Sequence, residues 1–180
     1  MRYWIVNRQG RSIVLIGMMG AGKSSVGCCL RRRTGLPLHD TDEIVRANFG
    51  MPISEIFPKF GEPSFRQAET KALRNLATAE QAIIVTGGGI VVRNENVELL
   101  KRLGAIVWLD TDEQTLFARA SRKRNRPLLQ TKHPREAFSQ ILGARRTLYA
   151  NIADIRVDTS VLTDEEVAVA ILTKLGRNES

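Results

Sequence analysis

Gly17-Met18-Met19-Gly20-Ala21-Gly22-Lys23-Ser24 fits the pattern G-x-x-x-x-G-K-[ST], which forms a loop that cradles phosphate groups. Glycines allow backbone conformations that a side chain forbids, so successive N–H groups can turn inward around a phosphate. Lys23 is then expected to reach the terminal phosphates of a nucleotide, and the Ser24 hydroxyl to ligate Mg²⁺. We therefore predict a P-loop over residues 17–25, followed by a helix whose positive N-terminal end adds to the anion site.

The residues on either side of this loop support the assignment. Residues 12–16 are a short apolar, β-branched run that predicts a buried parallel strand. Residues 25–33 predict a helix that ends at Gly35, with Pro37 beyond it. Strand, glycine loop and helix thus follow one another in the order that a phosphate site requires.

Downstream, short apolar runs alternate with helical patterns. Strands are predicted at residues 36–39, 82–86, 105–109 and 155–157, and helices at 43–48, 94–102, 112–122, 135–149 and 164–175. Asn94 and Thr163 are the expected N-caps of two of these helices. Residues 53–78 are predicted to be more irregular, with a helix from Ser64 onward. We expect residues 1–180 to form a single α/β domain of three layers with a central parallel sheet of about five strands.

Composition limits the class of protein. The 180 residues, 43% of them hydrophobic, suffice for one core, and no apolar run approaches the length of a membrane span. The N-terminus lacks the features of a signal peptide, so a cytoplasmic location and no membrane partner are expected. The adjacent Cys28 and Cys29 are expected to be small buried hydrophobes in a reducing compartment. A net charge of +8 fits anionic small molecules, and without an aromatic-interleaved basic stretch we expect no nucleic-acid partner.

Polar or flexible residues follow several of the predicted strands, where parallel sheets bind their ligands. Asp40 and Asp42 follow the second strand, Gly87-Gly88-Gly89 the third and Asp110 the fourth. If the chain stays extended, the two aspartates point the same way, so that one supports Mg²⁺ near Ser24 while the other faces an acceptor hydroxyl. The alternative is an N-cap aspartate and a surface carboxylate. The three glycines exceed what a turn needs and would let a ligand approach bare backbone closely.

Residues 123–134 break the alternation, because they are basic, contain two prolines and show little periodicity. A stretch of this length inside a compact domain is more often a functional lid than a connection. Arg66, Arg126 and Arg145 lie in different segments, so the sequence does not show whether they converge. Arginine offers a planar fork for carboxylate or phosphate, which makes these three candidate ligand contacts.

These motifs together resemble the shikimate kinases over nearly the whole chain. The resemblance is carried, in this order, by residues 17–25, Asp40-Thr41-Asp42, Gly61-Glu62-Pro63-Ser64-Phe65-Arg66, Gly87-Gly88-Gly89, Arg126-Pro127-Leu128-Leu129, and Arg145 through Leu148-Tyr149. It implies the three-layer P-loop NTPase fold with a lid and a small substrate-binding helical segment at about residues 43–78. The implied activity is ATP-dependent phosphorylation of the 3-hydroxyl of shikimate, giving shikimate 3-phosphate and ADP in aromatic amino-acid biosynthesis.

The resemblance also implies a role for each site residue. Shikimate would be held by Asp42, Arg66, Gly88 and Arg145. ATP would be held by Gly20, Ala21, Gly22, Lys23, Ser24, Ser25, Arg122 and Arg126, with Arg122 near the adenine and Arg126 on the lid. Mg²⁺ would be bound by Ser24 and Asp40, and the catalytic residues would be Lys23, Asp42 and Arg126. The expected partners are shikimate and ATP, and the expected assembly is a monomer.

Two other functions stay open. One is a related small-molecule kinase, such as a gluconate kinase, against which the acceptor set of Asp42, Arg66, Gly88 and Arg145 argues. The other is a catalytically silent domain of the same fold, against which the intact Lys23, Asp42 and Arg126 argue. The metal site has an alternative too, since Asp110 ends an apolar strand as the Mg²⁺-supporting aspartate of many P-loop proteins does. We prefer Asp40, because Asp110 could simply begin the turn into the next helix.

Overall fold

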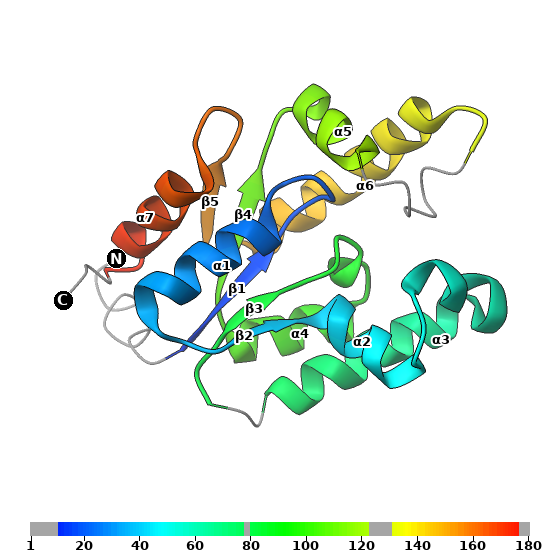
Figure 1. The fold of residues 1–180 in the computed structure, drawn as a ribbon, viewed down its shortest axis with the longest axis horizontal. Helices are drawn as coiled ribbons and strands as arrows, with labels where there is room; N and C mark the ends of the chain where they lie inside the picture. The colour runs from blue at the N-terminus through cyan, green and yellow to red at the C-terminus, as the bar shows by residue number, and fades with distance from the viewer. Residues whose placement is uncertain (1–10, 78–79, 123–130, 177–180) are drawn as a thin grey trace.

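The computed structural model describes residues 11–77, 80–122 and 131–176. Helices and strands alternate along this part of the chain (Figure 1). In order they are β1 (Ser12–Ile16), α1 (Lys23–Thr34), β2 (Leu38–Asp40), α2 (Thr41–Phe49), α3 (Ile53–Leu76), β3 (Ile83–Val85), the 3₁₀ helix η1 (Ile90–Val92), α4 (Asn94–Leu103), β4 (Gly104–Asp110), α5 (Glu113–Ser121), α6 (Pro134–Ile152), β5 (Ile155–Asp158) and α7 (Asp164–Lys174). The predicted alternation is confirmed, with boundaries that shift by a few residues.

The five strands form one parallel sheet in the order β2-β3-β1-β4-β5. β1 lies at the centre, and all five of its residues are buried, as its continuous apolar sequence predicts. The register pairs Leu15 with Val85 and Ile16 with Trp108, while Asp40 of β2 also lies opposite Val85. The carboxyl ends of β1, β2, β3 and β4 therefore meet along one edge of the sheet.

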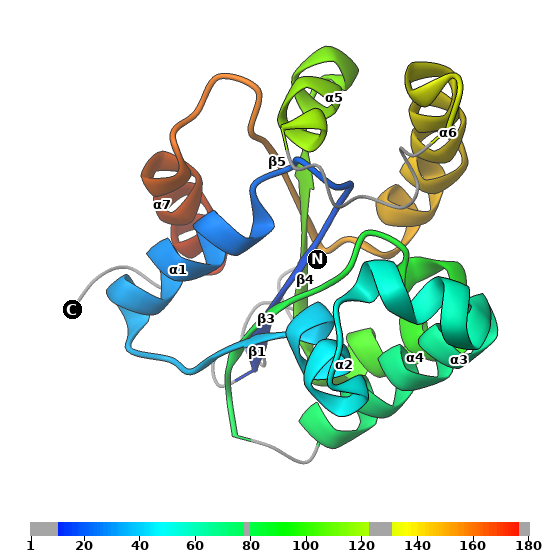
Figure 2. The same cartoon turned by 45° about the vertical axis from the view of Figure 1, so that its right-hand side comes forward.

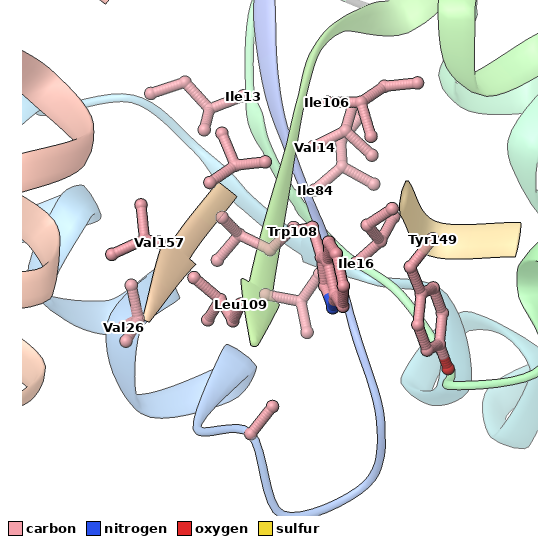
Figure 3. Packing of buried hydrophobic residues seen from close by; sticks show 14 of the residues in the cluster. Ile13, Val14, Ile16, Val26, Ile84, Ile106, Trp108, Leu109, Tyr149 and Val157 are labelled. Carbon is pink, nitrogen blue, oxygen red and sulfur yellow. The ribbon is translucent and has the colours of Figure 1, made fainter. Parts of the chain in front are cut away.

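Helices cover both faces of this sheet, which confirms the three-layer architecture. Figure 2 shows α1 and α7 on one side, and α4 and α6 on the other. Because side chains alternate along a strand, each central strand supplies both layers of the core. Figure 3 shows this alternation in β1, where Ile13 points toward the side that holds Val157, and Val14 toward the side of Ile106.

Residues 53–60 correct the sequence analysis, because they are helical and not irregular. They form the first part of α3, which continues to Leu76 across a break at Gly61 (φ 77°, ψ 164°). α3 contains Pro58 and Pro63, and proline is unfavourable inside a helix. However, Pro63 begins the second part of α3, where its missing N–H removes no intrahelical hydrogen bond.

The two parts of α3 pack with α2 around a hydrophobic cluster separate from the main core. Val45, Ile56, Phe65 and Ala72 are buried in it. The ring centroids of Phe57 and Phe65 lie 4.8 Å apart across the break in α3. Burial of this apolar face stabilises residues 53–60 as a helix, and this tertiary contact overrides the local preference that the prolines indicate.

Two smaller predictions were wrong and one was confirmed. Asn94 does not cap α4: it is the first helical residue, and Arg93 precedes it as N-cap without a side-chain hydrogen bond. Cys28 is exposed, whereas Cys29 is buried as expected, because successive residues of a helix point about 100° apart. Thr163 caps α7 in a reciprocal capping box with Glu166.

The predicted lid is only partly covered by the structure. Residues 123–130, which include Arg126, lie outside the described residues, and residues 131–133 are irregular before α6 begins at Pro134. Within the described ranges, no helix is both long and apolar enough to span a bilayer.

Two helical glycines should respond in opposite ways to alanine, which has the higher helix propensity by about 1 kcal/mol. A Cβ at Gly27 of α1 would lie 2.8 Å from Val85 Cγ2 and 3.1 Å from Leu38 Cδ1, whereas a Cβ at Gly143 of α6 meets nothing within 4 Å. Gly143→Ala should therefore raise the free energy of unfolding by up to about 1 kcal/mol. Gly27→Ala should lower it by about 1–2 kcal/mol, because overpacking outweighs propensity. Urea unfolding of both variants measures this, and a stabilised Gly27→Ala protein would contradict the close packing of α1 on the sheet.

Candidate functional site

The loop between β1 and α1 has the backbone geometry of a phosphate cradle. Gly17, Gly20 and Gly22 have φ angles of 142°, 90° and 88°. At Gly20 a second constraint applies, because a Cβ there would lie 2.5 Å from the carbonyl oxygen of Leu116. Only glycine fits both the left-handed conformation and the close approach of α5. The loop predicted from the sequence is thus present.

Lys23 closes this loop on itself. It is the first residue of α1, and its buried Nζ donates hydrogen bonds to the carbonyl oxygens of Gly17 (2.8 Å) and Met18 (3.0 Å). The ammonium group is therefore held at the mouth of the loop. Ser24 and Ser25 follow in the first turn of α1 and are exposed, so their hydroxyls are open to an approaching ligand.

The two aspartates after β2 differ from the expected extended arrangement. The strand ends at Asp40 and α2 begins at Thr41, so Asp42 lies in the first turn of a helix. Asp40 caps this helix, because its Oδ1 accepts a hydrogen bond of 2.9 Å from the backbone N–H of Asp42. The capping alternative is thus correct for Asp40. Burial raises the pKa of Asp40, although backbone hydrogen bonds and the charge of Lys23 act against that rise.

Gly87-Gly88-Gly89 lies at the centre of the site, and each glycine contacts a different predicted residue or loop. A Cβ at Gly87 would lie 2.5 Å from Asp42 Oδ1, and a Cβ at Gly89 would lie 2.5 Å from Nη1 of Arg66. A Cβ at Gly88 would lie 3.3 Å from the carbonyl oxygen of Gly17 in the P-loop. At Gly87 and Gly89 the close approach is made by the protein's own charged side chains, and the approach of a ligand stays a prediction.

Arg66 is held by two glutamates of its own helix. Its Nη1 donates to Glu69 Oε2 at 2.8 Å, and its Nη2 donates to the exposed Glu62 at 2.9 Å. Glu69 is only 1% exposed. Burial raises the pKa of Glu69, with a smaller contribution of the same sign from Asp42, while Arg66 and Arg145 act against the rise. The guanidinium of Arg66 is thus fixed against the glycine run before any ligand binds.

Arg145 reaches the same region from α6. Its side chain is buried, and its positive charge acts on both Glu69 and Tyr149. Tyr149, one helical turn further on, donates a hydrogen bond from its hydroxyl to the carbonyl oxygen of Gly88. Burial raises the pKa of Tyr149 to about 12, although the charge of Arg145 acts against this rise. The hydroxyl therefore stays protonated at neutral pH and holds α6 to the glycine run.

Asp110 has a role that the sequence did not indicate. Its buried carboxylate accepts hydrogen bonds from Nη2 of Arg146, at 3.2 Å to each oxygen, and forms an ion pair of 2.6 Å with Arg156. Arg156 also stacks over Trp108, 5.2 Å from its ring centroid. These contacts connect the end of β4 to α6 and β5, and they neutralise the carboxylate. The preference for Asp40 over Asp110 as a metal ligand is consistent with this pairing.

The structure brings most of the predicted residues to one edge of the sheet. Lys23, Asp40, Asp42, Arg66, the glycine run and Arg145 are connected through the contacts above. Arg122 lies apart from this list, exposed at the C-cap of α5. Sequence reasoning missed Glu69 and did not single out Tyr149 as a support. For Glu69 a weak signal existed, because a glutamate three residues after an arginine can pair with it on one helix face.

The oxygen atoms of Ser24 and Asp40 suit Mg²⁺ that binds together with a nucleotide. Mg²⁺ binds oxygen ligands and is commonly held by one or two carboxylates, water and substrate phosphates. Ser24 and Asp40 supply a hydroxyl and a carboxylate beside Lys23. No group of three or more His, Cys, Asp or Glu side chains suited to a metal ion occurs in the described part of the chain.

Comparison with known proteins gives one consistent family. A family model described as shikimate kinase matches residues 19–176. A shikimate kinase of Thermodesulfovibrio yellowstonii is 42% identical over 167 residues, which are 93% of this chain and 96% of the relative. One of Symbiobacterium thermophilum is 39% identical over 166 residues, which are 91% of this chain and 95% of the relative.

Solved structures confirm the P-loop kinase fold. The shikimate kinase from Acinetobacter baumannii in complex with shikimate has a TM-score of 0.89 and 34% identity, and the match covers 93% of this chain and 94% of that one. A gluconokinase from Sinorhizobium meliloti has a TM-score of 0.63 at 21% identity, covering 95% of this chain and 94% of that one. At that identity the second likeness shows a shared fold alone.

Glu69→Gln should change the pH dependence of stability. Burial raises the pKa of Glu69 in the folded protein above its value in the unfolded chain. The stability that the protonated Glu69 contributes is therefore fully present below the pKa of the unfolded chain. It is lost as the pH rises through the pKa that Glu69 has in the folded protein. The variant lacks this titration, so its free energy of unfolding relative to the wild type should increase between pH 4.5 and 7.5. Each unit of pKa rise corresponds to about 1.4 kcal/mol. Urea unfolding across this range measures the difference.

Glu62→Gln is the matched control, since it alters the exposed partner of the same arginine. Its effect should stay below about 1 kcal/mol at either pH, as expected for a surface ion pair. Parallel curves for wild type and Glu69→Gln would contradict the raised pKa.

Proposed function

The chain belongs to the shikimate kinase family, whose members phosphorylate shikimate with ATP, and we propose that the residues gathered around the glycine run carry out this reaction. The γ-phosphoryl group of ATP is transferred to the 3-hydroxyl of shikimate, which gives shikimate 3-phosphate and ADP. The observation that supports these residue roles most directly is the position of Gly87-Gly88-Gly89. Its backbone lies against the P-loop on one side and against Asp42 and Arg66 on the other.

Lys23 is the cation that the P-loop presents to the transferring phosphoryl group. Its Nζ donates to loop carbonyl oxygens, and we expect phosphate oxygens of ATP to replace them as acceptors. The loop N–H groups and the N-terminus of α1 stabilise the other phosphates. Gly20, Ala21, Gly22, Ser24 and Ser25 complete this part of the site. Arg126 on the lid and Arg122 at the end of α5 complete the nucleotide contacts in this proposal.

The acceptor site lies on the other side of the glycine run. Arg66 and Arg145 offer guanidinium groups for the carboxylate of shikimate, and Gly88 offers a backbone with room for the ring. Asp42 faces the acceptor hydroxyl, orients it and can take its proton as the phosphoryl group arrives. Glu69 carries a charge opposite to that of the two arginines, so it limits their mutual repulsion while the site is empty.

Mg²⁺ belongs to this proposal as a companion of ATP. Ser24 and Asp40 would hold it, and when bound it would neutralise charge on the phosphate oxygens. Asp110 is neutralised by Arg146 and Arg156, so it is less suited to this role. A monomer in the cytoplasm stays a prediction from the sequence.

The direct test is an assay of ADP formation with shikimate and with gluconate as acceptors. The wild type should form ADP at a substantial rate only with shikimate and Mg²⁺. Lys23→Ala should lower kcat by a factor of about 10³ or more, because the variant lacks the cation that meets the transferring phosphoryl group. Equal ADP formation with and without shikimate would contradict the proposal, and turnover of gluconate in its place would favour the sugar-acid alternative.

The neighbouring Arg145 and Arg146 allow a matched test of the acceptor site. Arg145→Ala should raise the KM for shikimate about 30-fold or more. The desolvated carboxylate of shikimate loses one of its two guanidinium partners, at a cost of about 2–5 kcal/mol. Arg145→Lys should rescue only part of this loss, since a point charge cannot bind two oxygens in one plane. Arg146→Ala removes an arginine of the same helix that bonds to Asp110, so it should leave the shikimate KM within about threefold of wild type. Steady-state kinetics with both substrates varied decides the question, and similar KM values for both alanine variants would refute the assigned role.

A further inference from the structure

The acceptor site is built from elements that are not adjacent in the chain. Arg66 lies on α3, while the glycine run precedes η1. β3 separates α3 from η1 along the chain, so their local sequence does not fix the distance between them. A guanidinium packed against Gly89 needs such a fixed distance, because the space there does not admit even a methyl group. Some interaction between α3 and η1 must therefore set the spacing.

A buried polar pair lies between these two elements. Thr70 is one helical turn after Arg66 on α3, and its Oγ1 lies 2.7 Å from Oδ1 of Asn96 on α4. Asn96 in turn donates from Nδ2 to the carbonyl oxygen of Ile90, the first residue of η1, at 3.1 Å. Asn96 is fully buried and Thr70 is only 4% exposed. The path runs from α3 through two side chains to the residue that directly follows Gly89.

The hydrogen bonds in this path have a defined direction. The Asn96 amide donates to a carbonyl oxygen, so its own oxygen must accept, and the Thr70 hydroxyl is the donor that it meets. The Thr70 oxygen can accept from Nη1 of Arg93 at 3.2 Å. Its single proton can go to Asn96 Oδ1 at 2.7 Å or to the Arg66 carbonyl oxygen at 3.0 Å, and the contact with Asn96 is the shorter. An aspartate at position 96 could not replace asparagine, since it has no donor for Ile90.

We propose that Asn96 and Thr70 are positioning residues that set the geometry of the shikimate site. They hold the end of the glycine run at the distance from α3 at which Gly89 meets the Arg66 guanidinium. This inference rests on the proposed function for its kinetic consequence, while the packing it describes is independent of activity.

Burial is the reason that this pair can act as a spacer. Water does not replace a lost partner in a site without solvent access, so removing one group leaves the other unsatisfied. The structure then shifts to find a new partner, and the shift acts on the glycine run. Displacement of a positioning group by about 1 Å can change rates or affinities about 100-fold.

Two substitutions at position 70 separate the hydrogen bond from the packing. Thr70→Val replaces the hydroxyl with a methyl group of similar shape, and Thr70→Ser keeps the hydroxyl and removes the methyl group. Thr70→Val should raise the KM for shikimate about 5- to 50-fold while the KM for ATP stays within about twofold. Thr70→Ser should retain a shikimate KM within about threefold of wild type.

A double-mutant cycle tests whether the two residues act as one unit. Asn96→Ala alone should also raise the shikimate KM selectively. Thr70→Val combined with Asn96→Ala should raise it by about as much as the larger single effect, because both remove the same bond. Effects that multiply would show that the residues act independently and would overturn the proposal.

Amide hydrogen exchange gives a readout that does not depend on activity. The N–H groups of Ile90 and Val92 donate to the carbonyl oxygens of Gly87 and Gly89 within this turn. Their exchange should be at least about tenfold faster in Thr70→Val and unchanged in Thr70→Ser. Unchanged exchange in Thr70→Val would overturn the inference even if the wild type proved inactive with shikimate. An inactive wild type with the expected exchange pattern would contradict the proposed function alone.

Discussion

Parallel pairing of β1 with β3 and β4 is the constraint on which the rest of the site depends. Parallel strands all end at the same edge, so the P-loop after β1 and the glycine run after β3 are brought side by side. A Cβ at Gly88 would lie 3.3 Å from the carbonyl oxygen of Gly17, so the two loops touch backbone to backbone. Phosphoryl transfer needs donor and acceptor in contact, and in the proposed arrangement of the two substrates this sheet would supply that proximity.

The balance of charge around the glycine run is the second organising feature. Arg66 and Arg145 bring two positive charges close together, and Asp42 and Glu69 bring two negative ones. The buried Glu69 pairs with Arg66 and fixes the orientation of its guanidinium group. The arginine therefore does not need a ligand to hold it in place. A carboxylate ligand would enter a site whose donors are already in place, which lowers the entropic cost of binding.

Much of the fold could be predicted because its elements are encoded locally. A continuous apolar run specifies each central strand, and Thr163 with Glu166 specifies the start of α7. The prediction failed at residues 53–60, which were expected to be irregular, because packing of α3 on α2 stabilises a helix there. It failed again at Asp42, because the chain turns into α2 directly after β2. In both places, contacts beyond the local segment decided the outcome.

The sequence by itself determined the phosphate loop and, through its family resemblance, the class of reaction. The spacing of Gly17, Gly22 and Lys23 identifies a phosphate-binding loop without information from the remainder of the chain. Only the tertiary structure assigned Asp110 to two arginines, Tyr149 to Gly88, and Thr70 to Asn96, which lies 26 residues further along. The physical reason is that local patterns report backbone preference and periodicity. The free energy that a buried polar contact contributes depends instead on which distant segment excludes water from it.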